Sequence, residues 1–284
     1  MGVAAEVLIT EFTDPVCPWA YSAEPFRLKL EWLYGDQLAW DTRMVVLAEH
    51  PSDYERRGFT PEKQAASLTR IARDHRMPID AAQRPRMAAT LPACRAVVGA
   101  RVHAPDRMRP LLRRLRIRHF SMQLLDEPDT IEGAAEDVGV EVAELRRWLH
   151  DEAVEREVRA DMAAAREPTA AARALDHKLA AAPGGRRYTC PSYEFVRVAD
   201  GQRLSVPGFQ PFAGYDVAVA NLVPDLDRRR PPETVEEALT WAAMPLATQE
   251  VAVLCDLSFE DARAQLGRVA EEHHVGYDGF WTIA

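Results

Sequence analysis

Two apolar runs of strand type flank the first helical segment of the chain. Residues 7–12 carry closely spaced aliphatic and aromatic side chains, and Asp14-Pro15 then breaks the run. Residues 18–34 have apolar positions at helical spacing, whereas residues 38–47 alternate imperfectly and end in strand formers. Because a helix joins them, the two strands are expected to be parallel.

The middle of the chain shows only helical periodicity, from about residue 60 to residue 165. Thr60-Pro61 is typical of a helix start, because the threonine can cap the helix and proline is tolerated at its first position. Pro78 and Pro92 interrupt the pattern and separate helices. We therefore expect an all-α segment here.

Strand patterns return after this helical segment. Residues 193–198 and 204–206 have strand propensity and are separated by the turn residues Asp200-Gly201. Residues 212–222 then have the pattern of an amphipathic helix. This stretch predicts a β-hairpin followed by a helix.

The last sixty residues differ in character. A polar, proline-rich stretch at 224–233 is typical of a domain boundary. After it we expect helices at 235–244, 247–255 and 259–272 and an aromatic end, an order that resembles a small winged helix-turn-helix unit. Residues 224–284 hold five arginines and twelve acidic residues, a net charge of −7, which opposes contact with phosphates. We expect no nucleic-acid partner and interpret this part as a packing or dimerisation module.

Composition adds limits on the class of protein. With 284 residues, 47% of them hydrophobic, the chain can bury one large core or two smaller ones. The net charge of −9 argues against general affinity for nucleic acid. No run approaches the roughly 20 apolar residues of a membrane span, and Glu6 and Glu11 replace the basic region of a secretory signal. We expect a cytoplasmic protein with no membrane partner. Four cysteines are then thiols by default, namely Cys17, Cys94, Cys190 and Cys255.

Cys17 occupies a distinctive position, between the first strand and the first helix. Pro18 suits the first helical position, so Cys17 falls at or near the N-cap. The unpaired N–H groups and the helix dipole there favour a thiolate, which is the attacking form of cysteine. The alternative is a small buried apolar residue. The order of strand, turn, Cys-Pro and helix favours the reactive interpretation.

The motif D-P-V-C-P-W-A-Y resembles the thioredoxin-like DsbA superfamily, and most of all its FrnE and 2-hydroxychromene-2-carboxylate isomerase branch, in which C-P-W-C-[YF] is typical. The resemblance implies an α/β fold of thioredoxin type with an all-α insertion over the cysteine and a small helical, winged-helix-like C-terminal appendage. Ala20 stands where the second cysteine would be, which removes the ordinary dithiol cycle. The expected parts are a thioredoxin-like domain at 1–58 and 184–224, a helical insertion at 59–183 and a C-terminal module at 225–284.

The resemblance also implies a cis-proline that faces the redox cysteine. Pro191 matches that proline, and its rival Pro207 better fits the loop before the last helix of the fold. Cys190 would then lie close to Cys17. A sulfur there can resolve a Cys17 adduct, or it can be a small side chain without a redox role, and both interpretations stay open.

Further site residues follow from the same resemblance. Thr189 and Pro191 would present backbone to a substrate, while Pro18 and Trp19 would shape the helix start and its apolar cover. No C-x-x-C or histidine pair completes a metal site around the cysteines, so no metal is expected.

The arginine-rich stretch at 107–118 has two interpretations. It is either a solvated helix face or an edge that recognises the carboxylate of a thiol or of an acidic substrate. We interpret His119 as a surface or capping group and Cys94 as a core residue.

The leading hypothesis is a thiol-disulfide oxidoreductase of DsbA/FrnE type. Cys17 attacks a disulfide-bearing substrate, and Cys190 or a small thiol such as glutathione or mycothiol releases the mixed disulfide, with no tightly bound cofactor. One alternative is an enzyme of the glutathione-transferase-kappa or chromene-carboxylate isomerase type, in which residue 17 holds a small thiol cosubstrate. Another is a catalytically degenerate scaffold with a buried, unreactive Cys17 and no groove beside the insertion. A homodimer is left open.

Overall fold

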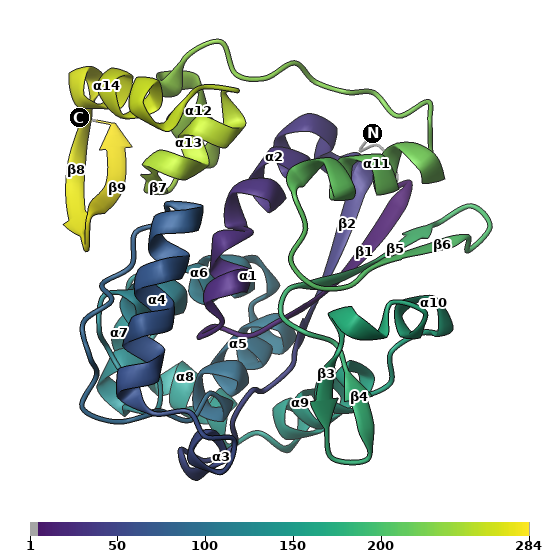
Figure 1. Cartoon of the computed structure of the whole chain (residues 1–284), viewed down its shortest axis with the longest axis vertical. Coiled ribbons are helices and arrows are strands. Elements are labelled where there is room, and N and C mark those ends of the chain that lie inside the picture. The colour runs from purple at the N-terminus through teal and green to yellow at the C-terminus, as the bar shows by residue number, and fades with distance from the viewer. Residues whose placement is uncertain (1–4, 284) are drawn as a thin grey trace.

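A four-stranded mixed sheet lies at the centre of the structure, a computed structural model that describes residues 5–283 (Figure 1). The strand order is β2-β1-β5-β6. Strand β1 (Val7–Thr13) is parallel to β2 (Leu38–Met44) and antiparallel to β5 (Ser192–Arg197), which pairs with β6 (Arg203–Val206). The parallel pair and the later hairpin were both predicted from the sequence, and both are confirmed.

The helical segment after β1 forms two helices, not one. Helix α1 (Pro18–Ser22) and helix α2 (Glu24–Tyr34) meet at Ala23. Pro25 explains the break, because it has no N–H to donate to the carbonyl of Tyr21. Together with α11 (Phe212–Leu222), α2 packs its apolar face on the sheet.

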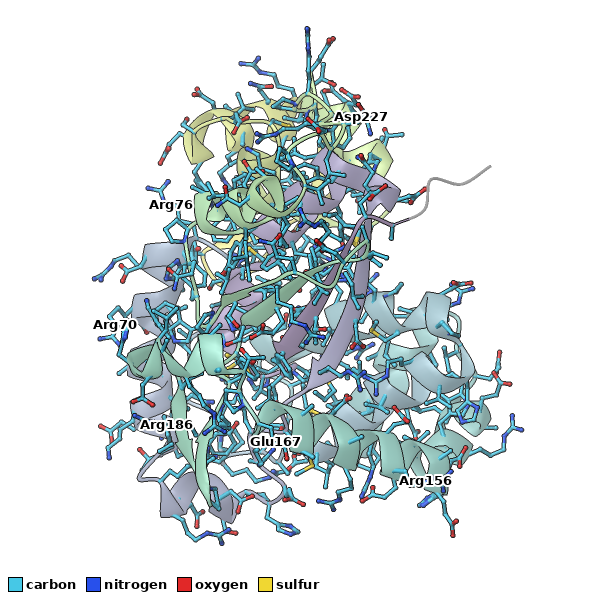
Figure 2. All side chains as sticks on the ribbon, turned by 90° about the vertical axis from the view of Figure 1, so that its right-hand side faces the viewer. Arg70, Arg76, Arg156, Glu167, Arg186 and Asp227 are labelled. Atoms are coloured by element: carbon cyan, nitrogen blue, oxygen red, sulfur yellow. The ribbon has the colours of Figure 1, made fainter. Side chains whose placement is uncertain are left out.

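Eight helices follow β2, as the helical periodicity predicts. They are α3 (Ser52–Arg56), α4 (Pro61–His75), α5 (Leu91–His103), α6 (Pro105–Phe120), α7 (Pro128–Glu136), α8 (Val142–Leu149), α9 (Glu152–Ala165) and α10 (Ala170–Arg173). Around α5 they enclose an apolar core of their own, and Cys94 is fully buried in it, as predicted. Charged side chains such as Arg70 and Arg156 point away from the body of the molecule (Figure 2).

A short hairpin that the sequence pattern did not predict connects these helices to β5. It consists of β3 (Ala180–Ala182) and β4 (Gly185–Arg187). Gly184 and Gly185 at its turn have φ angles of 82° and 148°, which glycine adopts without strain. The hairpin lies directly before the segment that carries Cys190.

The C-terminal module contains a small sheet as well as helices. Its elements are α12 (Val235–Ala242), β7 (Leu246–Ala247), α13 (Thr248–Leu254), α14 (Phe259–Val269), β8 (Ala270–Val275) and β9 (Asp278–Ile283). The predicted helix at 259–272 was therefore too long. Gly276, with φ of 63°, turns the chain against the backbone of Ile79, and β8 pairs with the aromatic strand β9. Helices followed by a β-hairpin agree with the winged-helix resemblance.

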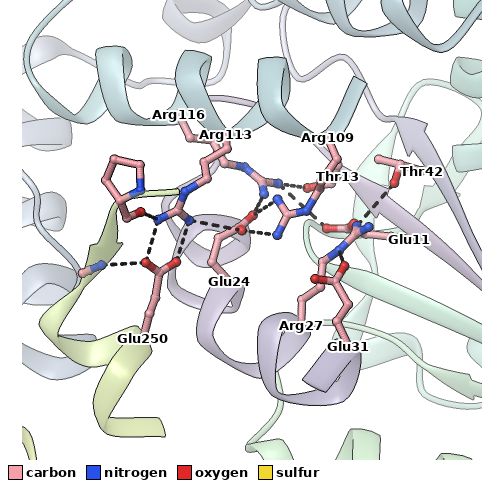
Figure 3. A network of polar contacts seen from close by, with 12 residues as sticks. Glu11, Thr13, Glu24, Arg27, Glu31, Thr42, Arg109, Arg113, Arg116 and Glu250 are labelled. Carbon is pink, nitrogen blue, oxygen red and sulfur yellow. Dashed lines mark hydrogen bonds and ion pairs between the residues drawn. The ribbon is translucent and has the colours of Figure 1, made fainter. Parts of the chain in front are cut away.

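Buried ion pairs connect the helical insertion to the rest of the protein (Figure 3). Arg109, Arg113 and Arg116 lie on one face of α6, at spacings of four and three residues. Arg109 donates to both carboxylate oxygens of Glu24 in α2, at 3.0 and 2.5 Å. Arg113 donates to both carboxylate oxygens of Glu250 in α13, at 2.6 and 2.7 Å. Arg116 also contacts Glu24. Both interpretations of the arginine-rich stretch were wrong for these residues, because their guanidinium groups are neither solvated nor free to bind an anion.

Candidate active site

Cys17 lies at the N-cap of α1, as predicted. Its φ and ψ angles of −75° and 114° are extended, Pro18 begins the helix, and the Cys17 carbonyl accepts the first helical hydrogen bond, from Tyr21 N at 3.0 Å. The Cys17 N–H donates to the carbonyl of Asp14 at 3.2 Å, so the loop after β1 is closed by a turn. The sulfur is thereby held at the positive end of a helix.

Cys190 faces Cys17 across the site. The Cys190–Pro191 peptide bond is the one cis bond among residues 5–283, at the proline that the resemblance indicated. The Cys17 Sγ donates to the carbonyl oxygen of Cys190 at 3.2 Å. Both side chains are buried, with exposed fractions of 6% and 7%, and both are free thiols. The structure thus brings the Cys17 sulfur against the backbone of Cys190, 173 residues away in the chain, and both side chains lie in one buried apolar cluster.

The environments of the two thiols differ in their effect on ionisation. Hydrogen bonding from the Cys190 side chain lowers the pKa of Cys17, and the backbone N–H groups of Ala20 and Trp19 lower it further. Burial and the charge of Asp14 act in the opposite direction but are outweighed. Burial, followed by the neighbouring Cys17, raises the pKa of Cys190 well above its ordinary value. Cys17 is therefore the sulfur that ionises first, and Cys190 is the proton-bearing neighbour.

Asp14 holds the loop in place, a role that sequence reasoning missed because Asp14-Pro15 was interpreted only as a break. Its carboxylate is fully buried and accepts hydrogen bonds from Val16 N at 3.0 Å, Leu47 N at 2.8 Å and the Thr90 hydroxyl at 2.9 Å. Burial raises the pKa of Asp14 despite these donors. The carboxylate thus connects the cysteine loop to the segment after β2 and to the start of α5.

The other predicted site residues surround the two sulfurs. Thr189 donates from its hydroxyl to the carbonyl of Lys178 at 2.8 Å, and its own carbonyl accepts from the Ser192 hydroxyl at 2.7 Å. Trp19 is 39% exposed and contacts the rings of His75 and Phe209. The hydroxyl of Thr189 is therefore occupied within the fold, whereas the ring of Trp19 is accessible to a substrate.

His119 is not a surface or capping group. It is 2% exposed at the end of α6, and burial followed by the charge of Arg84 holds its pKa well below the ordinary value. His119 neither lines the groove beside Cys17 nor contacts either cysteine, and we assign it no part in the site.

A largely apolar groove of about 530 Å³ starts beside Cys17. Val16, Pro18 and Trp19 form its inner wall, and residues of α3, α4 and the β3–β4 hairpin form the rest. The groove therefore lies between the thioredoxin-like part and the helical insertion, where a degenerate scaffold was expected to have none. The burial of Cys17, in contrast, agrees with that scaffold. Within the described part of the chain, no three His, Cys, Asp or Glu side chains gather to hold a metal ion.

No helix within residues 5–283 has both the length and the apolar character needed to cross a membrane.

Solved structures with a similar fold include two bacterial thiol-disulfide proteins. The chain superposes on a probable DsbA oxidoreductase from Streptomyces coelicolor with a TM-score of 0.54 and 19% identity, over 80% of this chain and 92% of the other. It superposes on the cytosolic disulfide reductase DsbM from Pseudomonas aeruginosa with a TM-score of 0.52 and 16% identity, over 77% and 98% of the two chains. At these identities the similarity describes the fold alone.

Comparison with characterised sequences gives a relative and a family. The chain is 25% identical to the ClpXP adapter protein SpxH of Halalkalibacterium halodurans over 288 aligned positions. The alignment covers 96% of this chain and 87% of the adapter. A family model described as the DSBA-like thioredoxin domain matches residues 8–170, which include Cys17 and most of the helical insertion. The chain belongs to the family of DSBA-like thioredoxin domains.

Proposed function

We propose that this protein is a cytoplasmic thiol-disulfide oxidoreductase in which Cys17 is the nucleophile and Cys190 the resolving thiol. The observation that carries the proposal is the placement of the Cys17 sulfur at a helix N-terminus, 3.2 Å from the carbonyl of Cys190 and beside its side chain. The DsbA-type fold supports the reaction class. The cytoplasm is the compartment named for the Pseudomonas neighbour.

The reaction proceeds in two exchange steps. The Cys17 thiolate attacks one sulfur of a substrate disulfide, forming a mixed disulfide and breaking the substrate S–S bond, and the leaving thiolate takes up a proton. Cys190 then loses its proton and attacks the Cys17 sulfur, which forms a Cys17–Cys190 disulfide and releases the second substrate thiol. The substrate gains two electrons and the protein loses two. A small thiol such as glutathione or mycothiol is the reductant that returns the protein to its dithiol form.

The remaining site residues have supporting parts in this proposal. Pro18 fixes the start of α1, and the exposed ring of Trp19 covers the entrance to the sulfurs. The backbone at Thr189 and Pro191 is where an extended substrate would pair. Ala20 provides no thiol, so the resolving role passes to Cys190.

A small-thiol enzyme of the transferase or isomerase type remains the alternative within the same site. There, Cys17 would hold the thiol of a cosubstrate without exchanging with it. The buried, high-pKa thiol of Cys190 would then have no redox partner.

The experiment is a map of the thiols by mass spectrometry after mild oxidation, with and without glutathione. The wild type is expected to form a Cys17–Cys190 disulfide, and Cys190→Ser is expected to stop at a mixed disulfide on Cys17. If Cys17 takes up a small thiol in both proteins and never pairs with Cys190, a monothiol reaction is favoured over resolution by Cys190. An unreactive Cys17 would contradict both.

A second candidate function is that of an adapter for regulated proteolysis. The extent of the SpxH match favours this function, because the match spans 96% of the chain. The two solved structures leave about a fifth of the chain uncovered. That share is close to the size of the C-terminal module. That module is also held to the insertion by the buried Arg113–Glu250 pair, as a fixed binding surface requires.

The two functions are separated by complementation. Proteins that accumulate when this gene is deleted are identified by quantitative proteomics. The deletion strain is then complemented either with the wild-type chain or with the chain that carries both Cys17→Ser and Cys190→Ser. An adapter is expected to restore normal turnover of those proteins without either thiol. An oxidoreductase is expected to restore it only with both thiols present.

A further inference from the structure

A pocket of about 490 Å³ adjoins the apolar groove beside Cys17 and is rich in arginine. Arg57, Arg166 and Arg187 line it, from the end of α3, the end of α9 and strand β4. Pocket and groove share four lining residues, Leu47, Arg57, Ala181 and Arg187, so they form one continuous surface. The pocket is therefore continuous with the groove whose inner wall contains Val16 and Pro18, the two chain neighbours of Cys17.

These three arginines lack carboxylate partners among residues 5–283. Arg57 donates to the carbonyls of Asp53 at 2.9 Å and Leu47 at 2.7 Å. Arg166 donates to the carbonyls of Met162 at 2.8 Å and Val45 at 3.3 Å, and Arg187 donates to the carbonyl of Tyr188 at 2.7 Å. Backbone carbonyls position a guanidinium group but do not neutralise its charge.

Several other arginines of the helical insertion are paired with carboxylates. Arg95 donates to Glu155 at 2.6 Å, and Arg101 donates to the buried carboxylate of Asp161 at 2.8 Å. The three arginines of the pocket therefore keep uncompensated charge within a chain whose net charge is −9.

The two carboxylates that line the pocket are already engaged. Asp53 pairs with Arg56 and accepts from the N–H groups of Glu49 and His50, at 2.8 and 2.9 Å. Glu49 pairs with Arg159 at 2.8 Å. Neither neutralises the arginines named above, and the pocket keeps an excess of positive charge.

The positive charge is concentrated near the sulfurs. Burial lowers the pKa of Arg166, and the repelling charge of Arg187 lowers it further, while the charge of Glu49 opposes both. The charge of Arg187 also acts on Cys190, whose pKa it lowers against the stronger effect of burial. A bound anion would relieve the repulsion and would lie beside the reacting disulfide.

We propose, building on the proposed function, that Arg57, Arg166 and Arg187 bind the anionic group of a small disulfide substrate while Cys17 attacks its sulfur. Arginine forms paired hydrogen bonds with both carboxylates and phosphates, so the site selects acidic disulfides of either kind over neutral or cationic ones. Mycothiol carries no ionised acid group, whereas glutathione has two carboxylates, so a mixed disulfide between glutathione and a second thiol is the better match.

The test measures the rate at which Cys17 forms a mixed disulfide with each of four probes. Glutathione disulfide carries carboxylates, coenzyme A disulfide carries phosphates, hydroxyethyl disulfide is neutral and cystamine is cationic. The wild type is expected to prefer one or both anionic probes, with a preference that falls as salt is added. The stronger of the two anionic rates identifies the acid group that the pocket accepts.

Variants then assign the preference to the pocket. Arg166→Gln and Arg187→Gln are each expected to lower the ratio of anionic to neutral rate about tenfold, the effect of one charged hydrogen bond. The matched control is Arg186→Gln, which removes the same charge one residue away on β4, where the guanidinium is paired with Asp176. A wild type that shows no preference would overturn the proposal, and so would an equal loss in the control.

A second measurement separates this proposal from the proposed function. S-methylglutathione, which has no reactive thiol, is titrated calorimetrically into the Cys17→Ser protein. Binding that is weakened by Arg187→Gln supports the anion site even if Cys17 proves unreactive. If no binding is detected and the four probes react at similar rates, the oxidoreductase stands and the anion site is wrong.

Discussion

Arg113 in α6 donates to both carboxylate oxygens of Glu250 in α13, and both side chains are buried. The same guanidinium donates to the carbonyl of Pro245 at 2.6 Å, and Glu250 also accepts from the N–H of Ala247 at 2.7 Å. This pair fixes the C-terminal module to the helical insertion. The C-terminal module is therefore held against the helical insertion, which also lines the groove.

Breaking this pair is expected to destabilise the protein strongly. Glu250→Gln removes the nearest counter-charge of buried Arg113 and leaves only Glu24, at 3.8 Å and shared with two other arginines, at an expected cost of about 3–5 kcal/mol in the free energy of unfolding. The measurement is urea unfolding followed by circular dichroism. Replacing both residues by methionine is expected to recover part of the loss, because neither position then carries a buried charge.

The control for that prediction is Glu132→Gln, whose partner Arg146 is largely exposed. Its effect on the free energy of unfolding is expected to be near zero, because solvent screens the pair. Similar losses in the buried and the exposed variants would contradict the prediction.

The cysteine site was largely predictable, because its signals are local. The strand, the Asp-Pro break and Cys17-Pro18 lie within about ten residues, and the resemblance supplied the facing Pro191. The arginines of α6 were misinterpreted because their partners, Glu24 and Glu250, lie far away in the sequence. One local signal was available, namely the spacing of four and three residues that places those arginines on a single face.

The anion pocket and the end of the chain had no readable local signal. Arg57, Arg166 and Arg187 come from three separate segments and only the fold brings them to one pocket. Strand β8 has the composition of a helix, and its pairing with the buried aromatic residues of β9 determined its structure. Tertiary contacts overrode local propensity there.

Cys190→Ala is expected to raise the pKa of Cys17. The Cys190 side chain stabilises the thiolate by hydrogen bonding, the largest of the influences on this group, and alanine removes that donor. The midpoint of the pH dependence of iodoacetamide alkylation at Cys17 should therefore move to higher pH. Cys190→Ser keeps a hydroxyl donor and is expected to move it less. An unchanged midpoint in the alanine variant would show that the two side chains do not interact.

Asp14→Asn is expected to shift the same midpoint in the opposite direction. The negative charge of Asp14 raises the pKa of Cys17, so its removal favours the thiolate at lower pH. The matched control is Asp36→Asn, an exposed position just before β2, at the opposite end of the parallel β1–β2 pair from Cys17. It is expected to leave the midpoint in place. A shift to higher pH in Asp14→Asn would indicate instead that a loosened loop had moved the sulfur away from its donors.

Ala20→Cys tests whether Cys190 replaces the thiol that is missing from the helix. Ala20 is 2% exposed, lies in α1 three residues after Cys17 and contributes a backbone N–H to the thiolate. The introduced thiol should compete with Cys190 for the mixed disulfide, because it lies on the same helical turn as Cys17. Mass mapping after mild oxidation is expected to show Cys17 paired within α1 and Cys190 free. Cys190→Ser, combined with Ala20→Cys, should then oxidise fully.

The control for this exchange is Ser22→Cys, which adds a thiol to the same helix beside a different cleft. It is expected to leave the Cys17–Cys190 disulfide as the main product. If Cys17 continues to pair with Cys190 in the Ala20→Cys protein, Cys190 is the faster partner of Cys17 even when the helix carries a second cysteine. Its resolving role then does not depend on the alanine at position 20. If neither disulfide forms, Cys17 is not an exchanging thiol, and the adapter becomes the better account of this chain.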